Sequence, residues 1–137
     1  MSRMIFVNLP VRELSKSRKF YEAIGAVNNP QFSDEASACM VLSDTISVML
    51  LTHPKWVTFT KKSIADATKA SEVMLALSCD SRDAVNATAE AAGKAGGAVD
   101  SNPPQDYGFM LNRHVEDPDG HVWALMWMDP NGMPAQA

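Results

Sequence analysis

The stretch EDPDGHVWALMWM, residues 116–128, decides how the end of the chain folds. Within it, Asp117-Pro118-Asp119-Gly120 suits a type I turn, because proline has its φ preset and Gly120 can take the left-handed conformation of a bulge. An apolar run follows the turn, and the strand-like residues 107–116 precede it. The stretch therefore predicts a β-hairpin with a three-residue loop.

The loop length fixes the register of this hairpin. The predicted pairs are Asp117 with His121, Glu116 with Val122 and His114 with Ala124. Paired residues point to the same face of a sheet. On this register the face of Ala124 also carries three polar side chains: Asn112, His114 and Glu116. His121 and Trp123 are expected on the opposite face, pointing away.

Upstream of the hairpin, the chain repeats one order of elements. A strand-like run, residues 3–11, is followed by ELSKSRKFYEAIG, whose apolar residues have helical periodicity up to Gly25, and by strand-like runs at 36–42 and 45–52. The order starts again with a strand at 73–79, a helix from residue 80 or 81 to about 92, and the hairpin. Sixteen residues separate Leu9 from Gly25 and also Leu77 from Gly93. A duplicated unit is the best account of the chain.

The duplication predicts an α+β fold of two paired βαβββ modules, which form a curved, half-closed barrel with the helices outside and a concave cavity inside. We expect a single domain over residues 1–137. Its parts are module one at about 3–52, a linker at 53–71 with a helical turn around 63–69, module two at about 72–128, and a frayed tail at 129–137.

Composition narrows the class of protein. The net charge of −4 and the scattered basic residues argue against nucleic acid as a partner. No apolar run approaches the roughly 20 residues that span a bilayer, and the N-terminus lacks a signal-peptide pattern. Cys39 and Cys79 have no CxxC spacing, so two reduced, buried thiols are expected. These features predict a cytoplasmic protein that binds neither membrane nor nucleic acid.

The duplicated unit, the stretch NLPVRELSKSRKFYEAIGA (8–26) and EDPDGHVW (116–123) together resemble the vicinal oxygen chelate superfamily. That group includes glyoxalase I, bleomycin-resistance proteins, fosfomycin-resistance enzymes and extradiol dioxygenases. The resemblance covers about residues 4–128, and VMLLTHPKW, PPQDYGFM and WMDP are similar to a glyoxalase-like bacterial subgroup. It implies that metal-dependent members hold a divalent ion with His, Glu or Gln from four strands, and that two-module chains often pair as homodimers, sometimes swapping modules.

In this chain the four metal positions implied by the resemblance fall at Phe6, Leu50, Met74 and Ala124. None of these side chains can ligate a hard or borderline ion, and a shift of one residue at Leu50 gives Met49 or Leu51, which cannot either. We therefore expect no metal and no other cofactor.

The cavity is predicted to be mostly apolar with a few polar groups, which is typical of a small-molecule site. Its expected apolar lining is Phe6, Leu50, Met74, Ala76, Ala124, Met126 and Met128, and its polar groups are Asn8, Asn112, His114 and Glu116. His53 and Trp56 are further candidates, in the segment where a flap would close.

Three functions remain open. The first is a glyoxalase-like protein that binds a small organic ligand without the usual divalent metal. The second is a lactoylglutathione-lyase-like isomerase or lyase, which uses metal from other ligands or uses His114 and Glu116 as catalytic acid and base. These two residues would lie about 7 Å apart at Cα on one strand. The third is an interaction or dimerisation module. His114 also has a plain structural explanation, as a surface or hydrogen-bonded histidine.

Overall fold

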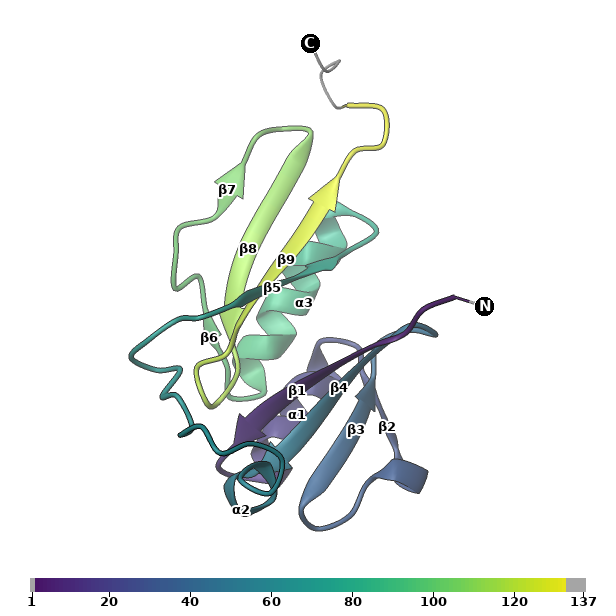
Figure 1. Ribbon diagram of the computed structural model, residues 1–137. Coiled ribbons are helices and arrows are strands. Elements are labelled where there is room, and N and C mark those ends of the chain that lie inside the picture. Colours follow the sequence, from purple (N-terminus) through teal and green to yellow (C-terminus); the bar gives the residue numbers. More distant parts are fainter. Residues whose placement is uncertain (1, 133–137) are drawn as a thin grey trace.

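Two sheets of the same strand order make up the protein (Figure 1). The structure, a computed structural model, describes residues 2–132. The first module contains β1 (Ile5–Val11), α1 (Leu14–Ala23), β2 (Val27–Asn29), the 3₁₀ turn η1 (Pro30–Phe32), β3 (Ser37–Val41) and β4 (Ile46–Thr52). Its strand order is β1-β4-β3-β2, with β1 parallel to β4 and the other pairs antiparallel.

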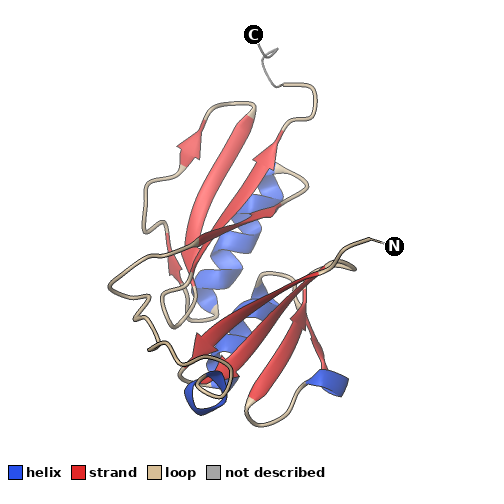
Figure 2. Ribbon diagram, in the orientation of Figure 1, coloured by secondary structure: helices blue, strands red, loops and turns tan. Residues whose placement is uncertain are grey.

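The second module repeats this plan. It contains β5 (Met74–Ser78), α3 (Arg82–Lys94), β6 (Ala98–Val99), β7 (Gln105–Asp106), β8 (Met110–Glu116) and β9 (Val122–Met128). The order is β5-β9-β8-β6, with β5 parallel to β9, and the short β7 pairs with β8. Each sheet has its helix on one side (Figure 2). The predicted α+β fold of two βαβββ modules is confirmed, and the described residues form two sheets with no closed barrel.

The two helices end differently, which corrects the spacing predicted from the repeat. Gly25 follows α1 with φ +109°, as expected of a residue that ends a helix. In the second module α3 continues through Gly93, and the glycine with a positive φ (+98°) is Gly96. The counterpart of Gly25 is therefore Gly96, because α3 has 13 residues and α1 has 10. Ser81 begins α3 as predicted, and its hydroxyl accepts a hydrogen bond from the Ala84 N–H at 3.0 Å.

The segment between the sheets contains one more element than expected. A short helix, α2 (His53–Trp56), begins directly after β4, and Pro54 occupies its first turn. The expected turn further on is present at Asp66, whose carbonyl accepts from the N–H groups of Lys69 and Ala70. In the predicted tail, the backbone carbonyl of Asp129 accepts a hydrogen bond from the Gly132 N–H. Residues 133–137 lie outside the described part of the chain.

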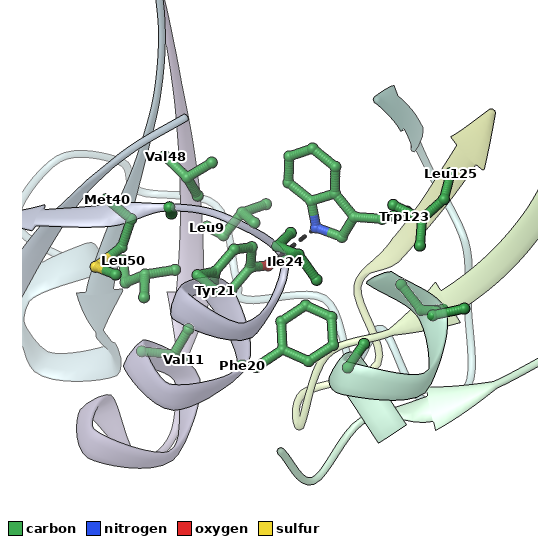
Figure 3. Close-up of a cluster of buried hydrophobic side chains, with 14 of the residues drawn as sticks. Leu9, Val11, Phe20, Tyr21, Ile24, Met40, Val48, Leu50, Trp123 and Leu125 are labelled. Atoms are coloured by element: carbon green, nitrogen blue, oxygen red, sulfur yellow. Dashed lines mark hydrogen bonds between the residues drawn. The ribbon is translucent and has the colours of Figure 1, made fainter. Parts of the chain in front are cut away.

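A single apolar core joins the two modules. In Figure 3 the side chains of α1, with Phe20, Tyr21 and Ile24, lie between those of the first sheet and those of β9. Trp123 and Leu125 supply the β9 side of this core. No helix within residues 2–132 is long and apolar enough to cross a membrane.

Candidate functional site

The face of the second sheet that points away from α3 carries most of the predicted polar residues. The hairpin register is the predicted one: His114 pairs with Ala124 and Glu116 with Val122. Gly120 has φ +90°, and its N–H donates to the carbonyl of Asp117, which closes the turn. A Cβ there would lie 2.8 Å from the backbone of the linker, so the turn also needs glycine for space.

We call this face the second open face. Strand pairing and alternation place on it Met74, Ala76 and Ser78 of β5, Met110, Asn112, His114 and Glu116 of β8, and Val122, Ala124, Met126 and Met128 of β9.

His114 is the chemically notable residue of this face. Its side chain is 7% exposed, and Nδ1 is buried without a hydrogen-bond partner. Asn112, two residues earlier on the same strand, has a buried Oδ1 that also lacks a partner, while its Nδ2 donates to Gln105 Oε1 at 3.3 Å. A buried polar atom without a partner costs roughly 1–3 kcal/mol. Such atoms are rare in folded proteins and need an explanation, such as a water or a ligand that is bound there.

The first sheet has a corresponding open face, opposite α1. Its β1 residues are Phe6, Asn8 and Pro10, and its β4 residues are Ser47, Met49 and Leu51. The prediction that Leu50 lines the cavity is wrong. Leu50 is fully buried in the shared core beside Leu9, because β4 residues alternate and Leu50 points toward α1.

A cavity of about 530 Å³ lies on the first open face. Asn8, Met49 and Leu51 form its floor, and residues of α2 and the following segment line it from the linker side: Lys55, Trp56, Phe59 and Thr60. The expected flap is thus built by α2, and Trp56 belongs to it, whereas His53 lines neither cavity. Met49 and Leu51 were not predicted to line it, because β4 is apolar on both faces from Val48 to Leu51.

A second cavity, of about 280 Å³, lies where the two modules meet. Asn8 and Pro10 line it from β1, and His121 and Val122 from the start of β9, while the linker closes it. It shares Asn8, Trp56 and Thr60 with the larger cavity, so the two adjoin. Neither cavity includes His114 or Glu116, so neither of them unites the predicted site residues.

The turn that contains Asp117 and Asp119 joins the two modules through hydrogen bonds. We call this group of contacts the clamp. Trp123 Nε1–H donates to Tyr21 Oη at 3.0 Å, and Tyr21 in turn donates to Asp117 Oδ2 at 2.7 Å (Figure 3 shows the first of these bonds). Asp117 Oδ1 accepts from the N–H groups of Asp119 and His121 at 2.9 Å each. Burial raises the pKa of the Asp117 carboxyl, and burial with the neighbouring Asp117 raises the pKa of Tyr21 well above its ordinary value.

Asp119 and His121 complete this clamp. Asp119 Oδ1 accepts from the Arg12 N–H and from Arg12 Nη1, at 3.0 and 3.2 Å. His121 lies off the face of Ala124, as predicted, but it does not point outward. Its Nε2 lies 2.8 Å from the carbonyl oxygen of Pro10, to which it donates, so it joins β9 to β1. The carboxylates of the turn therefore stabilise the module interface.

Comparison with known proteins agrees with this topology. The model of the family described as "Glyoxalase/Bleomycin resistance protein/Dioxygenase superfamily" matches residues 3–125. The chain belongs to this superfamily. The recognition made from the motifs around residues 8–26 and 116–123 is thereby confirmed. A search among curated proteins found no match.

Several solved structures have the same fold as this chain. A hypothetical protein from S. aureus has 26% identity and a TM-score of 0.75, over 93% of this chain and 95% of that one. Fosfomycin resistance protein FosX from Mesorhizobium loti has 20% identity and a TM-score of 0.64, over 93% and 90%. A bleomycin resistance determinant encoded on the transposon Tn5 has 20% identity and a TM-score of 0.63, over 93% and 99%.

The residues at the four metal positions that the resemblance implies do not fit a divalent ion. Phe6, Met74 and Ala124 lie on the open faces, but their side chains offer no oxygen or nitrogen donor. The fourth position, Leu50, lies in the core. Within residues 2–132 no group of three or more His, Cys, Asp or Glu side chains lies close enough to hold a metal. His114 and Glu116 are the histidine and carboxylate of the second open face, two donors at most.

Proposed function

We propose that this superfamily member binds a small organic molecule on its open sheet faces, with His114 as the central polar contact and without a divalent metal. The observation that carries the proposal is the buried Nδ1 of His114, which lacks a partner beside the equally unpaired Oδ1 of Asn112. The two atoms lie among apolar side chains, and a few convergent polar groups on an apolar surface are typical of ligand sites. A ligand would remove the cost of leaving both atoms unpaired.

The relatives support a binding role on this fold. FosX and the Tn5 determinant are described by resistance to fosfomycin and to bleomycin. At 20% identity these descriptions do not transfer to this chain, but resistance to two small organic molecules on this fold supports the proposal.

A thermal-shift screen of several hundred neutral fragments tests this proposal. We expect some fragments to raise the melting temperature of the wild-type protein, and His114→Ala to abolish these shifts. The substitution should leave the unliganded fold intact, because Nδ1 makes no hydrogen bond that would be lost. His53→Ala is the matched control, because His53 lies in α2 and not on the second open face, and it should retain the shifts. Equal shifts in wild type and His114→Ala would contradict the assignment of the site.

A second candidate function is a metal-free isomerase or lyase. It is favoured by the position of Glu116 two residues from His114 on the same face, where a carboxylate and an imidazole could share a proton transfer. Turnover of the glutathione–methylglyoxal hemithioacetal, with and without added Ni²⁺, Zn²⁺ or Co²⁺, tests it. Turnover without metal that is lost in Glu116→Gln would support the enzyme, and no turnover would reject this substrate.

We also propose that the protein is a homodimer. The edge strands β1 and β5 each pair on one side only. The large apolar residues at the start of these strands and just before them are more than half exposed: Met4, Ile5, Phe6, Val73 and Met74. Exposed apolar patches of this kind mark interaction surfaces, and unpaired strand edges favour association. A second copy would cover both edges and could bring the first open face of one chain opposite the second open face of the other.

Light scattering after size exclusion should give about twice the chain mass of 14.9 kDa. Phe6→Asp places a charge on the exposed edge and should shift the protein to monomer, whereas Phe32→Asp, on the exposed η1 turn, should not. A monomer mass for the wild-type protein at tens of micromolar would reject the dimer.

A further inference from the structure

Methionine is concentrated on the two open faces. The chain has nine methionines, of which Met1 and Met133 lie outside the described residues. Five of the remaining seven lie on the open faces and a sixth, Met4, directly precedes β1; the five are Met49, Met74, Met110, Met126 and Met128. Within residues 2–132 only Met40 belongs to the buried core. The core uses valine, leucine and isoleucine, so methionine is not simply the filler of this protein.

Thioether side chains favour contacts with aromatic groups. Methionine side chains are flexible and polarizable, and their sulfur makes favourable contacts with aromatic rings that leucine cannot make. Four of these methionines lie on the second open face together with His114, which suits a flat molecule: Met74, Met110, Met126 and Met128. Met110 pairs directly with Met128, and Met126 is two residues from Met128, so three thioethers lie next to one another. Trp56 and Phe59 add aromatic surface beside Met49 in the larger cavity.

The charge of the faces limits the ligand further. On the strands, the open faces carry one carboxylate, Glu116, and no lysine or arginine within the described residues. Lys55 lines the larger cavity from the flap, and its Nζ sits 5.6 Å from the centre of the Phe59 ring. An anionic ligand on the second face would lie near Glu116 with no cation of that face to pair with, which is unfavourable in a partly dry site.

Together with the unpaired Nδ1 of His114 and Oδ1 of Asn112, these features define a ligand class. We propose that the bound molecule is a planar aromatic compound without negative charge, which bears a hydrogen-bonding group that reaches His114. This inference rests on the proposed function and adds the chemistry of the ligand to it.

Three naphthalene-sized probes test this inference by isothermal titration. They are 2-naphthalenemethanol, its fully saturated decahydro counterpart, and 2-naphthoate, which is anionic. The first two differ in their π system and share the hydroxyl. We expect the aromatic alcohol to bind about tenfold tighter than the saturated one, and the carboxylate to bind weakest. Met126→Leu, which conserves side-chain volume, should reduce affinity for the aromatic alcohol by about two- to tenfold and leave the saturated alcohol unchanged.

The core substitution Met40→Leu is the matched control and should leave all three affinities unchanged, because Met40 is fully buried beneath α1. Equal binding of both alcohols, tighter binding of the carboxylate, or no binding of any probe overturns the inference. Stoichiometric binding of Ag⁺ that is lost in Met126→Leu would assign the thioethers to a soft cation and also overturn it. The proposed function fails separately, if the neutral fragment library gives no shift that depends on His114.

Discussion

Replacing Leu50 by alanine is expected to lower the free energy of unfolding by about 3 kcal/mol, within the range of roughly 2–5 kcal/mol for buried leucines. Leu50 is fully buried in the core shared by both modules, so truncation removes apolar contacts and leaves a void. Urea unfolding followed by fluorescence measures the change, and an unchanged denaturant slope would show that the loss reflects stability alone.

Met49→Ala is the matched control for this prediction. Met49 is adjacent in sequence and on the same strand, but it lines the larger cavity instead of the core. Its truncation should cost less than about 1 kcal/mol, because a partly exposed side chain buries less apolar surface. Equal losses for the two substitutions, or a larger loss at Met49, would mean that the faces of β4 are assigned the wrong way round.

Asp117→Ala should destabilise the protein by about 3 kcal/mol, because it leaves the Tyr21 hydroxyl and the N–H groups of Asp119 and His121 without their acceptor. The bonds lie in the buried clamp between the modules, so water does not readily replace the carboxylate. Thermal unfolding should show the loss. Asp117→Asn is the matched control: its amide oxygen keeps both backbone bonds, and it should cost about half as much or less.

Asp117→Asn and the wild-type protein should also differ in how their stability changes with pH. Burial raises the pKa of Asp117 in the folded state above its unfolded value, so the folded state holds the proton more tightly. The stability that this carboxyl contributes is therefore fully present below about pH 4 and declines as the pH rises through its folded pKa. Asp117→Asn removes this decline, so its stability relative to wild type should improve with rising pH over that window. A difference in stability between Asp117→Asn and wild type that stays constant with pH would show that Asp117 does not titrate as proposed.

In the second module, a few residues determine the turn and the strand pairing of the hairpin. Pro118 and Gly120 fix the turn, and the turn fixes the pairing of His114 with Ala124. The open face of β8 and β9 was therefore predictable, including the polar trio at its centre. The end of α3 was harder to predict, because Gly93 and Gly96 both suit a helix end. Gly93 lies within α3, where a Cβ would meet the Val99 side chain at 2.8 Å, and Gly96 has the positive φ.

The first half was harder for a physical reason. β4 is apolar on both faces, since Val48 and Leu50 meet the core while Met49 and Leu51 meet the flap, so alternation says nothing about which face is which. β2 has three residues, too few to show a period, and the same holds for the two-residue strands β6 and β7 of the second module. The clamp of Tyr21 on Asp117 joins residues 96 positions apart, and its partners are selected by tertiary packing that no local pattern contains.

The central claim is that the second open face binds an organic molecule through His114 and needs no metal. Its most direct test is isothermal titration of wild-type protein and His114→Ala with the fragment that gives the largest thermal shift, in buffer with and without excess EDTA. We predict a wild-type Kd that is the same within about twofold in both buffers, and a loss of at least about tenfold in His114→Ala. Binding that disappears with EDTA and returns when Zn²⁺ or Ni²⁺ is added would contradict the account.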